Sequence, residues 1–170
     1  MSTESKGAGL FEREFGPADH HVFASLAEGM IGLPLVRWRE TYGEGTILEF
    51  GQLVPRQSRS DRLPEDRGEW VVSDWGGDPV LRVTAAEVID SRKDGSPALQ
   101  ARLGEMTGDV VAHIRMLEPD LSLEIEFKTG RVFTIAASKE DPELDQWYVL
   151  APDGHSLGVT GDGKWYRRSG

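Results

Sequence analysis

A set of apolar residues recurs along this chain at a nearly constant interval, which constrains the fold more than any other feature. Phe50 and Phe127 lie 77 positions apart, each at the end of a Leu-Glu-containing segment. The same spacing relates four further pairs: Leu26 and Leu103, Trp70 and Trp147, Val72 and Val149, and Gly77 and Gly154. Two copies are fewer than the roughly three repeats that a solenoid needs. The pattern therefore predicts one domain built from two related halves around a shared core, at about 19–83 and 96–160. The alternative is a chance recurrence of residues that are common in strands.

Alternation of apolar and polar residues predicts that each half consists mainly of strands. In 121–127, apolar residues at every second position alternate with Ser and Glu. In 46–50, Thr46, Leu48 and Phe50 alternate with Ile47 and Glu49, which is the period of a half-buried strand. Helix signals precede these strands. Pro17 and Asp19 favour a helix start with Asp19 as the N-cap, and Ser96 is expected to cap a second helix that has Pro97 at its first position. The sequence thus predicts an α+β fold dominated by antiparallel sheet, with a pseudo-twofold relation between helix-plus-strands halves.

The ends and the longest loop complete the expected organisation. Residues 1–16 are predicted to be a flexible leader, followed by the single domain at 17–170. Residues 55–68 form a polar stretch with two prolines and four arginines. Loops of that length are uncommon in compact domains and are often functional or disordered. We interpret this one as a surface insertion.

The composition excludes several classes of protein. The net charge of −10 opposes binding to nucleic acid, which needs a basic face. No apolar run approaches the ~18 residues of a membrane span, and no apolar segment follows the N-terminal charges as in a signal peptide. The chain has no cysteine, which removes disulfides, thiolate catalysis and cysteine-based zinc sites. We expect a cytoplasmic protein.

The motifs that would indicate a cofactor or a metal fail on inspection. Residues 158–164 match the glycine and lysine positions of a phosphate-binding loop, but Trp165 stands where Ser or Thr would hold magnesium. Residues 90–95 begin like a calcium loop, but Arg92 occupies a ligand position. The four histidines show no ligand spacing. We therefore predict no cofactor, no metal and no catalytic residues.

One alternative keeps a chemical role open. His113, Glu124 and Glu126 are the donors that an enzyme or small-ligand binder could use in a cleft between the two halves. Glu124 and Glu126 lie on the same face of a predicted strand. Paired carboxylates do acid–base work only where the surroundings raise one pKa. A solvated polar face is the competing interpretation.

Three aromatic residues have no aromatic counterpart in the other half: Trp38, Tyr42 and Trp75. Trp75 precedes two glycines in a predicted turn, where a large apolar ring has no evident structural need. Exposed Trp and Tyr are enriched at protein interfaces. These three residues are the predicted partner-binding set. The alternative is that they cover one open end of the sheet.

The pattern of residues 26–32, 48–51, 68–70 and 121–130 resembles a class of small β-rich bacterial domains of unknown function that are common in actinobacteria. Some of these domains are similar to immunity proteins of polymorphic toxin systems. The resemblance covers about 22–160 and rests on structural glycines, aromatics and alternating apolar residues. It implies an intracellular binding protein with no catalytic residues to carry over. If it extends to immunity, it implies an acidic surface that faces a basic toxin.

These observations lead to one functional hypothesis and two alternatives. The leading hypothesis is a non-enzymatic, cytoplasmic module that binds another, basic, protein through an acidic surface and exposed aromatics. The first alternative is a structural or accessory subunit that self-associates through a sheet edge, as a homo-oligomer or within a larger assembly. The second is the ligand-binding or enzymatic cleft described above.

Overall fold

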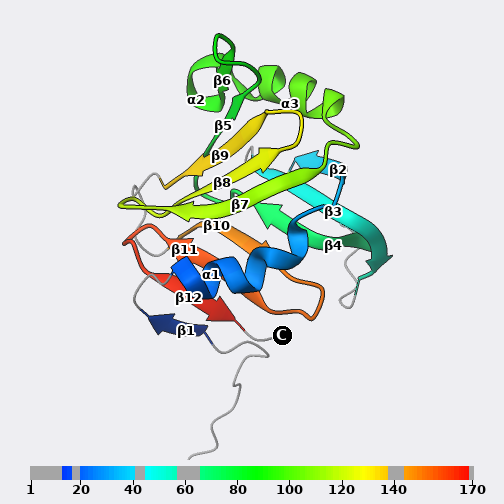
Figure 1. The fold of residues 1–170 in the computed structure, drawn as a ribbon. Coiled ribbons are helices and arrows are strands. Elements are labelled where there is room, and N and C mark those ends of the chain that lie inside the picture. The colour runs from blue at the N-terminus through cyan, green and yellow to red at the C-terminus, as the bar shows by residue number, and fades with distance from the viewer. Residues whose placement is uncertain (1–12, 17–19, 41–44, 57–65, 138–143, 169–170) are drawn as a thin grey trace, which may run out of the picture.

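The structure, a computed structural model, describes residues 13–16, 20–40, 45–56, 66–137 and 144–168. Over these residues strands dominate and form two antiparallel sheets, so the prediction of a fold dominated by antiparallel sheet is confirmed (Figure 1). The helices are α1 (His20–Ala27), the 3-10 helix η1 (Glu28–Met30), α2 (Ser91–Asp94) and α3 (Ser96–Glu105).

The larger sheet has seven strands in the order β1–β12–β11–β10–β4–β3–β2. In chain order they are β1 (Arg13–Gly16), β2 (Leu35–Glu40), β3 (Thr46–Pro55), β4 (Asp66–Ser73), β10 (Asp145–Leu150), β11 (Ser156–Thr160) and β12 (Trp165–Arg168). The smaller sheet has five strands in the order β6–β5–β9–β8–β7. They are β5 (Asp78–Arg82), β6 (Val88–Asp90), β7 (Val111–Leu117), β8 (Ser122–Phe127) and β9 (Val132–Ala136).

Each sheet combines strands from both parts of the chain. The larger sheet joins β4 to β10 at its centre, with Val72 directly opposite Val149. The smaller sheet joins β5 to β9, with Leu81 opposite Phe133. The chain therefore leaves the larger sheet after β4, contributes β5 and β6 to the smaller one, and returns to the larger one at β10.

The inner faces of the two sheets pack against each other around aromatic residues. Phe50 of β3 and Phe127 of β8 stack with ring centroids 6.3 Å apart. The indole of Trp147 on β10 donates a hydrogen bond to the carbonyl of Leu121 at 2.8 Å. Phe23 of α1 meets the same indole edge-on, with centroids 5.7 Å apart. A single core is thus shared by both sheets and α1.

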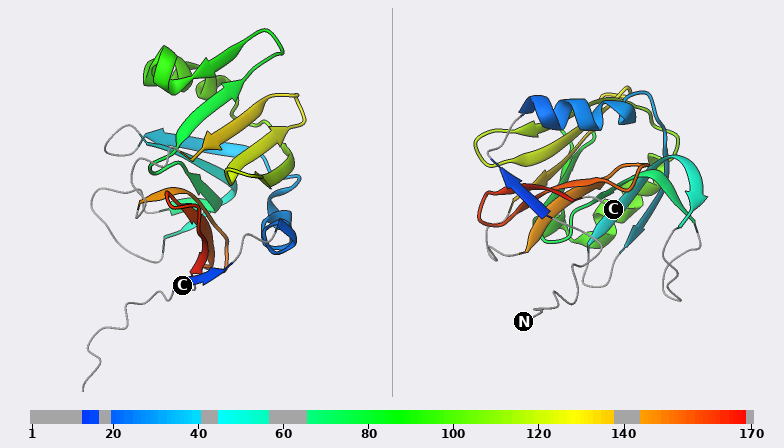
Figure 2. Two further views of the ribbon diagram at one scale, coloured as in Figure 1. Left: turned by 90° about the vertical axis from the view of Figure 1, so that its left-hand side faces the viewer. Right: turned by 90° about the horizontal axis from the view of Figure 1, so that it is seen from below.

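The helices cover opposite parts of this core. α1 runs alongside β7, and α2 and α3 lie at the β6 end of the smaller sheet (Figures 1 and 2). Leu99 and Leu103 form the buried face of α3. The N-cap of α3 is Gly95 rather than the predicted Ser96, which is the first helical residue. Asp19, the predicted cap of the first helix, lies outside the described residues.

Reciprocal hydrogen bonds join the segment before β2 to the segment before β7. Pro34 and Val110 form an isolated antiparallel bridge at the centre of this contact. The amide-to-carbonyl hydrogen bonds around it come in three pairs. Gly32 donates to Val111 at 2.9 Å and Gly108 to Leu35 at 2.7 Å; Leu35 donates to Asp109 at 2.8 Å and Val111 to Leu33 at 2.9 Å. In the third pair, Gly51 donates to Pro34 at 3.0 Å and Lys128 to Val110 at 2.8 Å. Gly32 and Gly108 have φ values of +88° and +95°, which only glycine adopts readily.

The structure corrects the sequence-based predictions at both ends of the chain. Residues 13–16, predicted as part of a flexible leader, form β1 and pair with β12; residues 1–12 lie outside the described part. The segment 165–168, to which no element was assigned, is the strand β12 itself. Of the predicted loop at 55–68, residues 66–68 belong to β4, and 57–65 are not described.

The constant offset does not relate equivalent strands after Phe50 and Phe127. Trp70 lies on β4, next to β3 in the larger sheet, whereas Trp147 lies on β10, in the sheet opposite β8. Both indoles are buried, as expected for structural residues. Trp70 and Trp147 therefore follow Phe50 and Phe127 at the same distance in the sequence, but they do not occupy equivalent strands in the fold.

Candidate functional site

Trp75 lies in the turn between β4 and β5 and is 56% exposed, the largest value for a large hydrophobic side chain among the described residues. The indole points outward because the backbone of this turn packs tightly against neighbouring segments of the chain. A Cβ on Gly76 would come within 2.6 Å of Leu144, and one on Gly77 within 2.5 Å of Ile135. The Gly77 amide also donates to Asp74 at 2.8 Å, which closes the turn. The backbone packs inward, and the indole is left outside.

Asp74 fixes the start of this turn and is 1% exposed. One carboxylate oxygen accepts the Thr46 amide at 2.6 Å, while the other is buried without a hydrogen-bond partner. Burial raises the pKa of Asp74 to about 7, because taking a carboxylate out of water disfavours its charged form. The hydrogen bond from Thr46 opposes the shift without cancelling it.

Trp75 separates two hollows. One, of about 280 Å³, lies on the outer face of the larger sheet and is lined by Trp75, Asp145, Tyr148, Leu150, Ser156 and Tyr166. The other, of about 270 Å³, lies toward α2 and is lined by Asp74, Asp78, Arg92 and the glycine turn, among others. We call Trp75 and these two hollows the Trp75 surface.

The floor of the first hollow depends on a glycine. A Cβ on Gly158 of β11 would come within 2.4 Å of the Tyr166 hydroxyl, so the tyrosine ring lies directly over this residue. That hydroxyl donates to Asp145 at 2.9 Å. The hollow is therefore aromatic on its walls and acidic at one edge.

The charge of the Trp75 surface is negative. Asp78 and Asp145 contribute carboxylates, and Asp74 adds a third at pH values above its raised pKa. Among the described lining residues, the basic one is Arg92, which lines the second hollow and pairs with Asp78 at 3.3 Å. A partner would thus meet an indole bordered by acidic groups.

Of the three predicted partner-binding residues, the structure describes Trp75 and Trp38, and these two do not line the same hollows. Trp75 is exposed as expected. Trp38 is only partly exposed, packs against the core and lines neither hollow. Its indole nitrogen lies next to Gly104 of α3, where a Cβ would be 4.0 Å away. Tyr42 lies outside the described residues.

The carboxylate pair of β8 is occupied by an arginine. Arg115 of β7 donates from Nε to Glu124 at 2.6 Å and from Nη2 to Glu126 at 3.1 Å. The guanidinium is half exposed, and His113, opposite Glu126 in the register, is exposed as well. An exposed salt-bridge network is the arrangement expected of a solvated sheet face.

Glu49 lies in an environment that strand alternation does not predict. Its side chain is on the face of β3 opposite Leu48 and Phe50, and it is completely buried there. Nε of Arg37 donates to one carboxylate oxygen, and Arg39 lies 3.6 Å from the other. Arg37 also donates to Asp66 at 2.9 Å. Arginines on the neighbouring strand thus compensate the buried charge.

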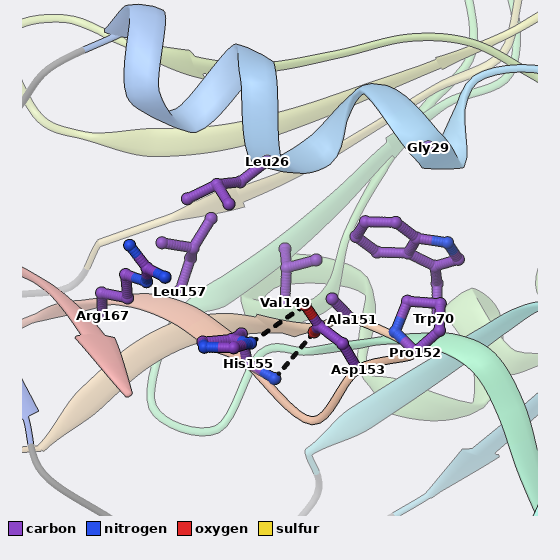
Figure 3. Close-up of a pocket in the computed structure, with 10 residues that line it drawn as sticks. All are labelled: Leu26, Gly29, Trp70, Val149, Ala151, Pro152, Asp153, His155, Leu157 and Arg167. Carbon is purple, nitrogen blue, oxygen red and sulfur yellow. Dashed lines mark hydrogen bonds and ion pairs between the residues drawn. The ribbon is translucent and has the colours of Figure 1, made fainter. Parts of the chain in front are cut away.

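A further pocket, of about 380 Å³, lies beneath α1 on the inner side of the larger sheet (Figure 3). Its walls are mostly apolar and come from Leu26, Gly29, Trp70, Val149, Ala151, Pro152 and Leu157. Asp153, His155 and Arg167 supply the polar groups. Sequence reasoning missed this pocket, because Arg167 falls in a terminal segment to which it assigned no element.

No group of three or more His, Cys, Asp and Glu side chains in the described part of the chain is placed to hold a metal ion. Over the same residues, none of the helices has the length and apolar character that crossing a bilayer requires. Comparisons with protein-family models, curated proteins and solved structures found no match.

Proposed function

We propose that this protein is a non-enzymatic module that binds a basic partner protein at the Trp75 surface. The observation that carries the proposal is the exposed indole of Trp75, 56% exposed and held out by a glycine turn between two hollows. A rigid aromatic anchor beside pockets is the arrangement typical of an interface hot spot. Burying the ring against a partner would recover apolar area that the free protein exposes to water.

Charge supports a basic partner. Asp78 and Asp145 border the indole, and the whole chain carries a net charge of −10. Complementary charge at the rim mainly accelerates association and selects among partners. Lys or Arg side chains entering the hollows would meet carboxylates there. The proposed location is the cytoplasm, where the resemblance to immunity proteins would make the partner a basic toxin.

The test is co-purification from the organism that makes the protein, at low salt, with three tagged forms. These are the wild type, Trp75→Ala and Leu53→Ala. Leu53 is a matched control, since it is 47% exposed at the far end of β3 from the Trp75 turn. We expect one basic protein at fixed stoichiometry with the wild type and with Leu53→Ala, released by added salt.

Trp75→Ala should weaken the complex about thirtyfold, the loss that a hot-spot side chain of about 2 kcal/mol implies. Recovery of the protein alone, or equal recovery with all three forms, would contradict the proposal. Light scattering on the same samples tests the self-associating alternative, which requires a mass that rises with concentration.

We also propose that the two halves of the chain are related by an approximate twofold axis. The reciprocal hydrogen bonds around Pro34 and Val110 support this, since exchanging the halves turns each bond into its mate. The strand order supports it as well, because each sheet contains strands from both halves of the chain. In this arrangement β4 corresponds to β9, and β5 to β10, so the equivalence departs from the offset of 77 after Phe127.

A further inference from the structure

The pocket beneath α1 is separate from the Trp75 surface. Successive residues of β10 point to opposite faces of the larger sheet: Tyr148 lines the outer hollow, whereas Val149 lines the inner pocket. The inner pocket is therefore independent of the proposed partner binding at the Trp75 surface.

The pocket has an apolar end and a polar end. Trp70 lies on β4 and Arg167 on β12, with β10 and β11 between them. Three interstrand spacings place these two strands about 14 Å apart across the pocket floor. Figure 3 shows the indole at one end and Arg167, with His155, at the other. Val149 and Leu157, both buried, form the apolar floor between these ends.

Trp70 closes the apolar end against the helix. A Cβ on Gly29 would come within 2.7 Å of the indole, so the ring packs directly on the helix backbone. Leu26 projects from α1 into the pocket nearer to Leu157 (Figure 3). At about 380 Å³, the pocket falls in the lower part of the ~300–1,000 Å³ range of small-molecule sites.

Arg167 supplies a cation whose hydrogen-bonding capacity is not used. Its Nε is buried and has no hydrogen-bond partner. Within the described residues, no ion pair involves this side chain. In the register of β12 it lies opposite Leu157 on one side and Glu14 of β1 on the other. A buried donor without a partner costs free energy that a bound acceptor would recover.

The carboxylate of Asp153, which lines the pocket, is engaged at its rim. Asp153 accepts the His155 amide at 3.0 Å, and its second oxygen lies 2.9 Å from Nδ1 of that histidine without hydrogen-bond geometry. The side chain of Asp153 is 65% exposed. The aspartate thus belongs to the turn at the rim, which leaves Arg167 available to a ligand.

We propose that this pocket binds a small amphipathic monocarboxylate, with its apolar chain along Val149 and Leu157 toward Trp70 and its carboxylate at Arg167. An apolar floor about three strands wide suits a medium-length chain. A guanidinium donates to carboxylates with charge-assisted bonds, stronger than those between neutral groups. A cationic ligand of the same length would be repelled at that end.

The test is calorimetric titration with octanoate and with octylammonium, which have the same chain length and opposite charge. We expect octanoate to bind with one-to-one stoichiometry and octylammonium not to bind in the pocket. Non-specific attraction to a protein of net charge −10 would give the reverse preference. Hexanoate, octanoate and decanoate should gain about fourfold in affinity per added methylene until the pocket is full.

Variants assign the binding to this pocket. Arg167→Gln should weaken octanoate about tenfold to a hundredfold, as expected for loss of a charged hydrogen bond. Arg82→Gln is the matched control, since Arg82 is exposed on the smaller sheet. Ala151→Phe keeps every charge and places a ring in the pocket, so it should abolish binding without affecting Arg167.

Three results would overturn the proposal. They are no heat of binding with octanoate at millimolar concentration, equal binding of octylammonium, or octanoate affinity that Arg167→Gln and Ala151→Phe both leave unchanged. Circular dichroism of each variant checks that it is folded. Because Ala151→Phe and Arg167→Gln change different residues, misfolding of one leaves the other to decide.

Discussion

Asp74 gives this protein an unusual dependence of stability on pH. The carboxyl is 1% exposed, and burial raises its pKa to about 7 from an ordinary value of 3.8. Between those two values the folded protein holds a proton that the unfolded chain has released. Stability therefore falls as pH rises from about 4 to about 7, which is the reverse of the usual behaviour of a carboxylate.

The size of this effect follows from the shift itself. Each pKa unit corresponds to about 1.4 kcal/mol, so a shift of about three units corresponds to about 4 kcal/mol of unfolding free energy. This contribution is fully present below pH 4 and is lost above pH 7. Asp153 and Asp162, whose pKa values are lowered mainly by hydrogen bonds from His155 and Thr160, act in the opposite direction.

Comparison with Asp74→Asn isolates this effect. Urea unfolding of both proteins, followed by tryptophan fluorescence from pH 4 to pH 8, gives the difference in their unfolding free energies. Contributions from all other groups cancel in that difference. We expect the wild type to lose about 4 kcal/mol relative to the variant across this range. The same measurement on Glu28→Gln, which removes an exposed carboxylate on η1, is the control.

A difference between wild type and Asp74→Asn that does not change with pH would refute the reasoning. It would mean that Asp74 is ionised in the folded protein throughout the range. The Thr46 hydrogen bond would then outweigh the cost of burial, since it is the principal group that opposes the shift.

Two further predictions concern the buried charge of Glu49 and the pairing of strands from the two halves of the chain. Glu49→Gln should destabilise the protein by about 3 kcal/mol in urea unfolding, because it leaves arginines facing a buried site without their carboxylate. Glu126→Gln, which disturbs the exposed pair with Arg115, should cost at most about 1 kcal/mol, and equal losses would contradict this assignment. Separately expressed fragments 1–94 and 95–170 should each fail to fold, since β4 would lose β10 and β9 would lose β5, and mixing them should restore a one-to-one complex. A dispersed NMR spectrum from either fragment alone would count against that prediction.

Local patterns in the sequence predicted some of the elements. Alternation identified β8, and Pro97 marked the first turn of α3. These signals succeed because they report on the chain within a few residues. The same reasoning identified Trp75 as exposed, since a glycine turn after a strand leaves no core for a large ring to enter.

Pairing between distant strands was beyond the sequence. An alternating strand shows which of its faces is apolar, but not which other strand lies beside it. The offset of 77 suggested that Trp70 and Trp147 hold equivalent positions, yet β4 and β10 lie next to each other in one sheet. The offset of 77 stops relating equivalent strands because the connection from β3 to β4 is longer than the tight turn at Gly130 that joins β8 to β9.

Glu49 shows the same limit at the level of one side chain. Alternation places it correctly on the face of β3 opposite Leu48 and Phe50, and a carboxylate in that position ordinarily predicts a face in contact with water. Here the part of the outer face around Glu49 is itself buried, since Ile47, Val71 and Ser73 on it are each less than 9% exposed. The periodicity of a strand therefore fixes the direction of a side chain but not its environment. Both candidate sites arise from that difference: Tyr148 and Val149 are consecutive residues, and each reaches a different hollow on a different face of the same sheet.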